Sequence, residues 1–442
     1  MDKKNQVKIL KGFRDFFAAD VALRNYVINI FRQVFEKYGY EPLETPALEY
    51  SDIFLKQSGE EATKLFYRFK DEGGRDIMLK YEVMISMCRA VAENLDKIVF
   101  PYKRYQIQTV WRAEKPQKGR FREFTQCDAD TLGASSVLAD AEFIQMGQEI
   151  LEKLGFKKFR ANISNRKFLA GLIEFAGGSS SQFIPICLSI DKLPKIGALA
   201  VKKELLEKRK ISSSVAEKIL ELINYQGTTS QLIAKYRQIL KNFPLALTGL
   251  SELEKIFQYL EIAGVDQGRY CFAPYLARGL AYYTGPIWEF EIIDGGVGSV
   301  AGCGRYDNVI GQFTGRQIPA TGGSFGLERI IEIMKERKMV NLPLTTTKVL
   351  ITNFADDTLD TLIKIAKALR QEDITTLLYP QTSRLDKQLK YADKKNIPYV
   401  IIVGPEEVKK QKIIFKDMKK ASQETTTIDA VIKRLKPATP RP

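Results

Sequence analysis

The stretch that decides the fold is WRAEKPQKGRFREFTQCDADTLG, residues 111–133. A run of β-type residues, 105–111, leads into it, and a polar segment containing proline and glycine follows. From Phe121 onward the chain alternates again with a period of two. Alternation on both sides of a turn-forming segment predicts two antiparallel strands joined by a long loop.

The loop between these strands is strongly basic. Glu114 is the only acidic residue in the interval 103–122, which carries a net charge of +6; its basic residues are Lys103, Arg104, Arg112, Lys115, Lys118, Arg120 and Arg122. A strand fixes where Arg112 points, whereas a mobile loop lets its other polar side chains (Lys115, Gln117, Lys118, Arg120) close on an anion. A solvated surface hairpin is the alternative, and it is the weaker one because Gln126 and Asp130 follow at strand spacing.

The composition indicates an ordinary globular protein. A length of 442 residues predicts two or three domains, and 45% hydrophobic with 27% charged residues is typical of a soluble chain. No apolar run is long enough to span a membrane and no signal-peptide core is present, so a cytoplasmic location is expected. The cysteines are scattered, which favours reduced thiols over a disulfide framework or a zinc cluster; they stand at positions 88, 127, 187, 271 and 303.

Charge and histidine content limit the possible functions. A net charge of +15 and a pI near 9.3 indicate a polyanionic partner, and nucleic acid is preferred over a membrane because no basic amphipathic helix with an aromatic face stands out. The chain contains no histidine, which excludes an imidazole base, a Ser-His pair or a His-ligated metal. Phosphoryl-type chemistry on ATP remains open, since it depends mostly on positioning and charge stabilisation.

Three blocks in the right order carry a family resemblance. Residues 111–133 resemble motif 2 of the class II aminoacyl-tRNA synthetases, in the form found in histidyl-tRNA synthetases. Residues 278–289 (RGLAYYTGPIWE) resemble the histidine-specific signature of that family, and residues 322–330 (GGSFGLERI) resemble its motif 3. GRYD, at 304–307, stands between the last two, and the resemblance extends from about Lys11 to Leu435.

The first part of the chain adds a fourth resemblance. After KGFRD at 11–15, apolar residues at helical spacing predict a helix over about 21–38 that ends at Gly39. Two prolines then keep residues 40–46 extended. The combination resembles motif 1, which in class II synthetases builds the interface of a homodimer. A plain helix-to-strand connection is the alternative.

The resemblance implies an α+β fold, an antiparallel sheet flanked by helices with a helical insertion and a C-terminal α/β domain. Residues 1–165 would form the first part of the catalytic domain and residues 268–340 the second. Residues 166–267 read as helical and polar and resemble the insertion that contacts the tRNA acceptor arm. After a linker, PLTTT at 343–347, alternating strands (349–352, 375–379, 399–403) and helices (359–371, 385–395) predict a small domain, 346–436, that resembles the anticodon-binding domain.

This C-terminal domain also carries charge suited to RNA. Residues 384–420 contain eleven Lys/Arg and five Asp/Glu, a net charge of +6. A basic α/β module suits contact with an RNA backbone, although a solvated charged helix is the alternative for most of the individual lysines. The tail after Leu435 is predicted to be disordered.

The resemblance assigns roles in activating an amino acid with ATP. Arg112 would hold the α-phosphate, Arg329 the far end of the triphosphate, and Arg278 the reacting phosphate. Glu114 and Arg120 would clamp the folded nucleotide. Arginine suits these roles because its planar fork grips phosphate oxygens at two points, although structural salt bridges are the alternative for each. Mg²⁺ would neutralise the leaving pyrophosphate, and no ligand cluster in the sequence demonstrates it.

A second group of residues occupies the family's amino-acid-binding positions. The substrate ammonium needs acceptors, and each imidazole nitrogen needs a partner. Besides Arg278, the residues concerned are Glu82, Gln126, Asp130, Tyr282, Tyr283 and Tyr306. Tyrosines in strands more often pack in the core, so the assignment of Tyr283 and Tyr306 rests mainly on the resemblance.

The chain also departs from the family pattern. Met84 stands where a threonine is usual, Ser86 where a proline is frequent, Ala281 where the signature has aspartate, and Cys303 where glycine is usual. Losing the threonine hydroxyl removes one contact to the substrate amino group, worth about 1.5–3 kcal/mol. These changes bear on the affinity for histidine more than on the class of reaction.

The predicted function is ATP-dependent activation of L-histidine and its transfer to the 3′ end of tRNA(His). One alternative is a non-catalytic, synthetase-like regulatory subunit of histidine biosynthesis. Such proteins usually lack the anticodon-binding module and lose the ATP arginines, whereas this chain keeps both. A second alternative is a prolyl or threonyl enzyme with the same C-terminal domain, against which the RGLAYYTG block argues.

Overall fold

The computed structural model describes residues 8–55, 63–279, 282–296 and 298–436. The chain divides into two compact units, the larger made chiefly of Arg24–Val340 and the smaller chiefly of the chain from Asn341 onward. Among the described helices none combines the length and the apolar character needed to cross a bilayer. Except for Lys436, the tail predicted to be disordered lies outside the described residues.

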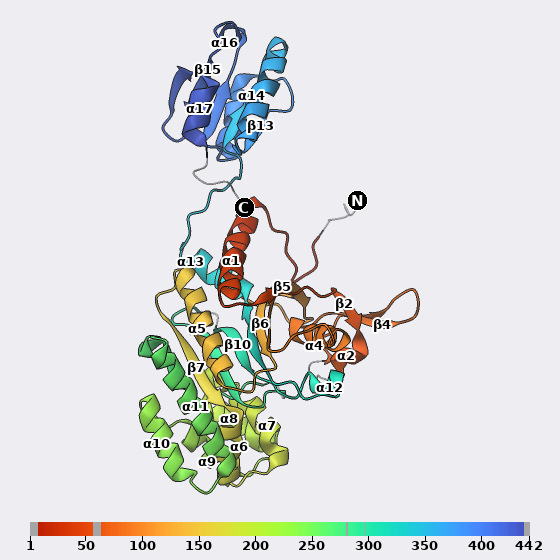
Figure 1. Ribbon diagram of the computed structural model, residues 1–442, viewed down its shortest axis with the longest axis vertical. Coiled ribbons are helices and arrows are strands. Elements are labelled where there is room, and N and C mark those ends of the chain that lie inside the picture. The colour runs from red at the N-terminus through yellow and green to blue at the C-terminus, as the bar shows by residue number, and fades with distance from the viewer. Residues whose placement is uncertain (1–7, 56–62, 280–281, 297, 437–442) are drawn as a thin grey trace, which may run out of the picture. The chain divides into compact units, whose positions relative to one another are not determined.

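The larger unit is built on one eight-stranded sheet (Figure 1). In spatial order its strands are β1 (Glu41–Pro42), β5 (Tyr102–Trp111), β6 (Glu123–Leu132), β11 (Ala320–Gly326), β10 (Ser299–Arg305), β9 (Pro286–Ile292), β7 (Phe159–Asn165) and β8 (Tyr270–Phe272). Only the edge pairs, β1 with β5 and β7 with β8, are parallel. The predicted antiparallel sheet is therefore confirmed, with two short parallel additions at its edges.

The predicted hairpin of residues 105–111 and 121 onward is β5 and β6. Its register runs from Tyr102 opposite Leu132 to Trp111 opposite Glu123, so the first strand begins three residues earlier than predicted. The second strand begins at Glu123 rather than Phe121. The Arg122 carbonyl still accepts from the N–H of Arg112, the residue opposite it, but the Arg122 N–H donates to the carbonyl of Gly12 at 2.9 Å.

One face of the sheet forms the main hydrophobic core. The helix α1 (Ala18–Lys37) is the helix predicted at 21–38, and it buries an apolar stripe that includes Phe31. The helix α5 (Leu138–Lys153) adds Phe143. Their rings meet strand side chains, Phe31 at 5.2 Å from Phe325 and Phe143 at 5.5 Å from Trp288 between ring centroids. Aromatic burial of this kind contributes strongly to stability, so this face is structural.

Shorter elements border the first strands of the sheet. The helix α4 (Val83–Glu93) packs on β5 and β6. A separate three-stranded sheet, which was not predicted, has the order β2 (Leu48–Tyr50), β4 (Asp76–Leu79) and β3 (Arg68–Lys70), with α2 (Ser51–Leu55) beside it. The remaining helices of the second catalytic segment are α12 (Gly311–Thr314) and α13 (Leu327–Glu336).

A helical region follows β7, as the pattern over 166–267 predicts. Figure 1 shows these helices gathered beside β7 and α5. They are α6 (Arg166–Phe175), α7 (Phe183–Ile190), α8 (Leu193–Glu207), α9 (Ser213–Ile223), α10 (Thr229–Ile239) and α11 (Pro244–Ile262). They belong to the larger compact unit, so the limits 166–267 of a separate insertion domain stay a prediction.

The smaller unit is an α/β domain with a five-stranded sheet. The strands, in spatial order, are β13 (Thr376–Leu378), β12 (Val349–Ile351), β14 (Tyr399–Ile402), β15 (Ile413–Asp417) and β16 (Ser422–Thr426). Its helices are α14 (Leu359–Gln371), α15 (Leu385–Lys394), α16 (Pro405–Lys409) and α17 (Ile428–Leu435). Each face carries a core of its own, one under α14 and α17 and the other under α15. The predicted alternation is confirmed, while the β15–β16 hairpin and the last two helices were not predicted.

Candidate active site

The face of the large sheet opposite α1 and α5 carries the polar side chains. Strand pairing sets them in rows, because directly opposed residues point to the same side. One row joins Arg104, Asp130, Gly322, Gly304 and Ile287 across β5, β6, β11, β10 and β9. The next row joins Gln106, Asp128, Ser324, Gly302 and Glu289. Carboxylates therefore lie on both sides of a strip of small residues, which consists of Gly302, Gly304, Gly322 and Ser324.

The glycines of this strip let charged side chains lie flat on the sheet. A Cβ added at Gly302 would come within 2.1 Å of the Arg278 guanidinium. A Cβ added at Gly322 would come within 2.2 Å of Asp130 Oδ1. Since carbon cannot approach that closely, each glycine keeps space for the charged group above it.

Arg112 follows β5, and its side chain is held in place by Tyr81 and Phe124. Its Nε donates to the carbonyl of Tyr81 at 3.1 Å. Its guanidinium lies 4.3 Å from the ring centroid of Tyr81 and 5.2 Å from that of Phe124. These contacts orient the guanidinium without any carboxylate partner of its own among them, so it keeps the capacity to bind an anion.

The basic loop is partly ordered by its own charges. Arg120 Nη1 lies 3.4 Å from Glu114 Oε2, and a two-way backbone bridge joins Gln117 and Arg120. Lys118 is ion-paired with Glu336 of α13, whereas Lys115 is exposed. The loop predicted to close on an anion thus has one of its lysines tied to the helix of motif 3.

Two further arginines reach the same face from the second half of the catalytic chain. Arg278 has a left-handed backbone, with φ of 50°, and its Nη1 is ion-paired with Glu289 Oε1. Arg329 lies in α13 and donates from Nη1 to the carbonyl of Ser299. A positive φ in a non-glycine residue is uncommon and is often found at functional sites.

The electrostatics connect these arginines to one another. Burial lowers the pKa of Arg329, and the charges of Arg120 and Arg112 lower it further, while Glu289 and Glu114 oppose them. Burial would also lower the pKa of Arg278, but Glu289 raises it above its ordinary value. The same carboxylate therefore interacts with both Arg278 and Arg329. Arg112 and Arg120 act on Arg329, which shares Glu289 with Arg278; we call these four arginines the cationic end of the site.

Glu82 and Gln126 lie at the start of α4. Gln126 Oε1 accepts from the N–H of Val83, the first residue of the helix, at 3.2 Å, and its Nε2 donates to Ser324 Oγ at 2.8 Å. Glu82 is the residue before the helix; burial raises its pKa and Arg112 acts in the opposite direction. The amide thus joins α4 to the sheet strip, next to a carboxylate that faces Arg112.

The predicted tyrosines and Asp130 cluster at the other end of the strip. Tyr306 donates its hydroxyl hydrogen to Asp130 Oδ1. Tyr282 lies 4.7 Å from Tyr283 and 6.1 Å from Tyr306 between ring centroids. Asp130 is also ion-paired with Arg104. We call these tyrosines and Asp130, together with Glu82 and Gln126, the acidic end of the site; Arg104 and Asp128 adjoin it without belonging to it.

Three charged residues of this face were not predicted from the sequence: Arg104, Asp128 and Glu289. Asp128 lies midway between Gln126 and Asp130, so the strand period alone places it on their face. Arg104 was counted only as part of a basic run, and its pairing with Asp130 requires the strand register, which the sequence does not give. Glu289 closes the quoted signature block, but nothing in its spacing marks it as the partner of Arg278.

The departures from the family pattern fall in different environments. Met84 is buried in α4, with its Sδ 3.7 Å from Cys88 Sγ. Ser86 is also fully buried in this helix. Cys303 alternates with Gly302 and Gly304 and contacts Gly323, so it lies on the core face of the sheet, away from the acids. Ala281 lies outside the described residues.

Comparisons with known proteins cover nearly the whole chain. Residues 12–330 match the family described as histidyl-tRNA synthetase, and residues 343–437 match the anticodon binding domain. The chain is 36% identical to a histidine–tRNA ligase of Cytophaga hutchinsonii, over 96% of this chain and 98% of that protein. It is 36% identical to one of Clostridium tetani, over 99% and 100%. The crystal structure of histidyl-tRNA synthetase from Nostoc sp. PCC 7120 superposes with a TM-score of 0.84 at 32% identity and covers 98% of this chain and 100% of that one.

A mostly antiparallel sheet with a group of arginines on its polar face, in a chain that also has an anticodon-binding domain, defines a class II aminoacyl-tRNA synthetase. The regulatory alternative is not supported at the same level. A Bacillus halodurans C structure described as an ATP phosphoribosyltransferase regulatory subunit/histidyl-tRNA synthetase shares 19% identity, with a TM-score of 0.76 over 90% of this chain and 99% of that one, which shows the fold alone. The chain belongs to the histidyl-tRNA synthetase family and is a histidine–tRNA ligase, with ATP, histidine and tRNA(His) as substrates.

Proposed function

We propose that histidine is activated on the small-residue strip between the two ends of the site. The histidine carboxylate attacks the α-phosphorus of ATP, a P–O bond forms, and pyrophosphate leaves with its bonding electron pair. Two anions meet in this step, so fixed cations must offset their repulsion. The observation that supports this most strongly is the interaction of Arg278 and Arg329 with the same carboxylate, Glu289, on the face that Arg112 also reaches.

In this proposal the three arginines bind different parts of the ATP triphosphate. Arg112 binds the α-phosphate, Arg278 binds the reacting centre, and Arg329 binds the far end of the triphosphate. Glu114 and Arg120, already paired, clamp the folded nucleotide. Mg²⁺ enters as part of the MgATP substrate, since the described residues contain no cluster of three metal-ligating side chains.

The acidic end binds the amino acid. Glu82 and Gln126 accept from the ammonium group, and Asp130 with Tyr306 accepts the imidazole N–H, with Tyr282 and Tyr283 beside the ring. A site that hydrogen-bonds a substrate N–H rejects analogues without it, because its buried acceptor would be left unpaired. The tRNA 3′-terminal hydroxyl then attacks the adenylate carbonyl, AMP leaves, and the ester forms without any protein imidazole, since the chain has no histidine.

ATP–pyrophosphate exchange, run with each amino acid in turn, tests this proposal. Exchange that depends on histidine supports it. Exchange that depends on another amino acid would mean that the acidic end binds that amino acid instead of histidine. No exchange with any amino acid would favour a regulatory role. The cytoplasm is the proposed location, since translation there supplies tRNA.

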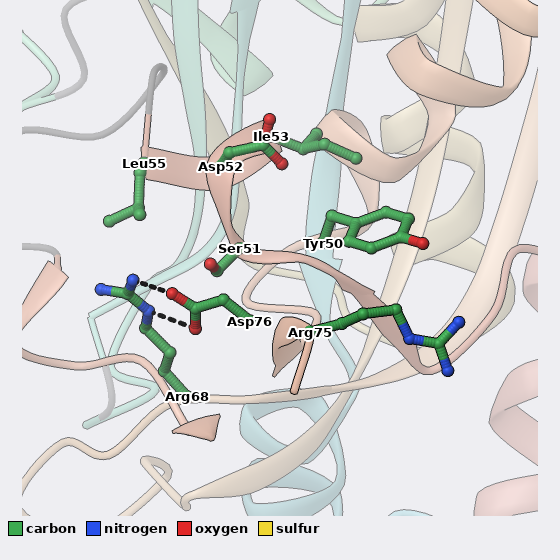
Figure 2. A pocket seen from close by; sticks show the side chains of 8 residues that line it. All are labelled: Tyr50, Ser51, Asp52, Ile53, Leu55, Arg68, Arg75 and Asp76. Carbon is green, nitrogen blue, oxygen red and sulfur yellow. Dashed lines mark hydrogen bonds and ion pairs between the residues drawn. The ribbon is translucent and has the colours of Figure 1, made fainter. Parts of the chain in front are cut away.

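We also propose that the chain acts as a homodimer through the three-stranded sheet that follows motif 1. Its cross-strand row Tyr50–Ile77–Phe69 is apolar, and Tyr50 and Phe69 are 54% and 47% exposed. A hollow of about 560 Å³ lies beside this row. Figure 2 shows Tyr50 and Ile53 among its lining residues and the ion pair of Arg68 with Asp76 at its border. An exposed apolar row rimmed by charges is typical of a protein interface.

Sedimentation of Tyr50→Asp and Phe69→Asp variants tests the homodimer. We expect both to shift the protein to monomer at micromolar concentration, whereas Lys70→Asp, on the adjacent exposed position, leaves the dimer intact. A wild-type chain that sediments as a monomer would contradict this part of the proposal.

A further inference from the structure

A fully buried arginine lies behind the acidic end. Arg104 of β5 has no exposed surface, and its guanidinium is ion-paired with Asp130 Oδ2. Asp128, on the same strand face two residues before Asp130, is 3% exposed, and Arg104 acts on its charge as well. A buried guanidinium without an ionised partner is strongly unfavourable, so this arginine requires a carboxylate beside it.

The charges in this cluster balance with one carboxylate ionised. Burial raises the pKa of both aspartates, and Arg104 is the main group acting in the opposite direction for each. Asp130 touches Arg104 and also accepts the Tyr306 hydroxyl hydrogen, which favours its anion. Asp128 has its pKa raised to about 8, so it holds a proton at neutral pH. The set is then neutral overall: one cation, one anion and one neutral acid.

We propose that Arg104 is a positioning residue for histidine recognition, which holds Asp130 as a fixed, ionised hydrogen-bond acceptor beside the amino-acid pocket. The proposal rests on the role proposed above for Asp130. Arg104 acts through Asp130 from the neighbouring strand, whereas the substrate lies above the glycine strip. Without the guanidinium, burial would favour the protonated acid, and the charged acceptor would be lost.

Other groups face this cluster from each packed element. Glu82, just before α4, raises the pKa of Asp128, and Cys88 of α4 is a buried thiol whose pKa is raised by burial and by Asp130. Tyr306 follows β10, and Ser324 of β11 is hydrogen-bonded to Asp128. Cys127 and Cys303 lie on the core face of the sheet, and burial raises the pKa of each thiol well above its ordinary value. Arg104 is therefore the one cation among the described groups that face the pair.

The first test compares Arg104→Met with Arg104→Lys in ATP–pyrophosphate exchange. We expect Arg104→Met to raise the KM for histidine roughly 10- to 100-fold, the effect of losing a hydrogen bond to a charged group, with the KM for ATP changed less than about twofold. Arg104→Lys keeps the charge and should recover part of the loss. A merely structural role would instead lower the amount of active enzyme and leave both KM values near those of the wild type.

The second test uses Asp128→Asn, which imitates the protonated acid, with Asp140→Asn as matched control. Asp140 is an equally buried aspartate on α5, paired with Arg305 on the core side of the sheet. Near pH 7 we expect Asp128→Asn to bind histidine within about threefold of the wild type, because the acid is already neutral there. Above about pH 8 the wild-type acid ionises and competes for Arg104, so the wild type should lose kcat/KM for histidine relative to Asp128→Asn.

The outcomes separate this inference from the function itself. Wild-type exchange without histidine dependence would overturn the proposed function. Histidine-dependent exchange in which Arg104→Met leaves the KM for histidine unchanged, or raises both KM values equally, would overturn the role of Arg104. Should Arg104→Met fail to fold, Arg104→Lys and the pH profile of Asp128→Asn decide. For Asp140→Asn we expect a pH profile parallel to that of the wild type. The same parallel profile for Asp128→Asn would overturn the role of Arg104.

Discussion

The two ends of the site differ in how deeply their charged side chains are buried. At the cationic end, the side chain of Arg278 remains 19% exposed beside its carboxylate, whereas at the acidic end Asp130 is 3% exposed and Arg104 is fully buried. ATP brings several charges with it, so its arginines can remain partly solvated until the nucleotide arrives. Histidine offers a neutral ring, so recognition there depends on an anion that is formed and desolvated in advance.

The largest expected effect comes from Arg278→Ala at the cationic end. We expect adenylate formation to fall by about 10²–10³-fold or more, because a fixed cation at the reacting phosphate stabilises the transition state. ATP–pyrophosphate exchange measures this, and tRNA binding by filter retention should stay near the wild-type value.

Arg269→Ala is the matched control for that variant. Arg269 is a partly exposed arginine ion-paired with Glu152, away from the strip. It should exchange at close to the wild-type rate. Equal exchange by the Arg278→Ala enzyme would mean that this arginine does not reach the reacting phosphate and that the site assignment is wrong.

A second, smaller effect is expected at the acidic end from Asp130→Asn. The amide keeps the shape but not the charge, so it leaves Arg104 without its anion and offers the imidazole a weaker acceptor. We expect the KM for histidine to rise roughly 10- to 100-fold with the KM for ATP nearly unchanged. The measurement is exchange at varied histidine and then at varied ATP. An equal rise in the KM values for histidine and ATP would mean that the two ends of the site do not bind separate substrates.

Most of this architecture could be predicted from local sequence patterns. The helix α14 begins and ends where its apolar period predicts, and β5 and β6 follow the alternation on either side of the basic loop. The motifs by themselves assign Arg112, Arg278 and Arg329 to the site. Short-range periodicity is set by the backbone itself, which is why it is readable from one sequence.

The parts that could not be predicted depend on long-range pairing. The ion pair of Arg104 with Asp130 exists only because β5 and β6 pair in one register, and a shift of one residue would send Arg104 to the core face. Glu289 meets Arg278 because β9 pairs with β10 next to Gly302. The small sheet of β2, β3 and β4 was not predicted because strands of three or four residues carry too little pattern.

A third prediction concerns the link between motif 3 and the sheet. Glu328 is 3% exposed and accepts from Thr125 N at 3.0 Å and from Arg24 Nη1 at 2.9 Å, so it ties α13, and with it Arg329, to β6 and α1. Glu328→Gln should destabilise the larger unit by about 2–4 kcal/mol, since it removes the anion of a largely buried pair. Differential scanning calorimetry should show the transition of that unit several degrees lower, by about 2–4 °C per kcal/mol.

Glu336→Gln, on the same helix, is the control for this variant. Its ion pair with Lys118 is about half exposed and contributes little. Its melting transition should therefore match that of the wild type. If both variants melt alike, Glu328 does not anchor the helix, and the KM for ATP should then be equally unaffected in both.

The smallest expected effect is a pH dependence from Lys80, a second buried cation, which follows β4 and is hydrogen-bonded to β5. Lys80 is 2% exposed and donates from Nζ to Gln108 Oε1 at 2.8 Å and to the carbonyl of Thr45 at 3.1 Å; burial lowers its pKa to about 8. The unfolded chain keeps the ordinary value of 10.5, so between about pH 8 and 10.5 it binds more protons than the folded chain. Stability must therefore rise with pH in that window, by an amount on the order of 1 kcal/mol. Below the window both states carry the charge, so this group adds no pH dependence there. Melting curves of the wild type and Lys80→Met, taken from pH 7 to 10, should diverge only above pH 8, whereas Lys37→Met, at an exposed lysine paired with Glu149, should follow the wild type throughout. Parallel curves for all three proteins would mean that Lys80 remains charged in the folded state. Burial would then lower the pKa of this lysine less than it raises the pKa of Asp128.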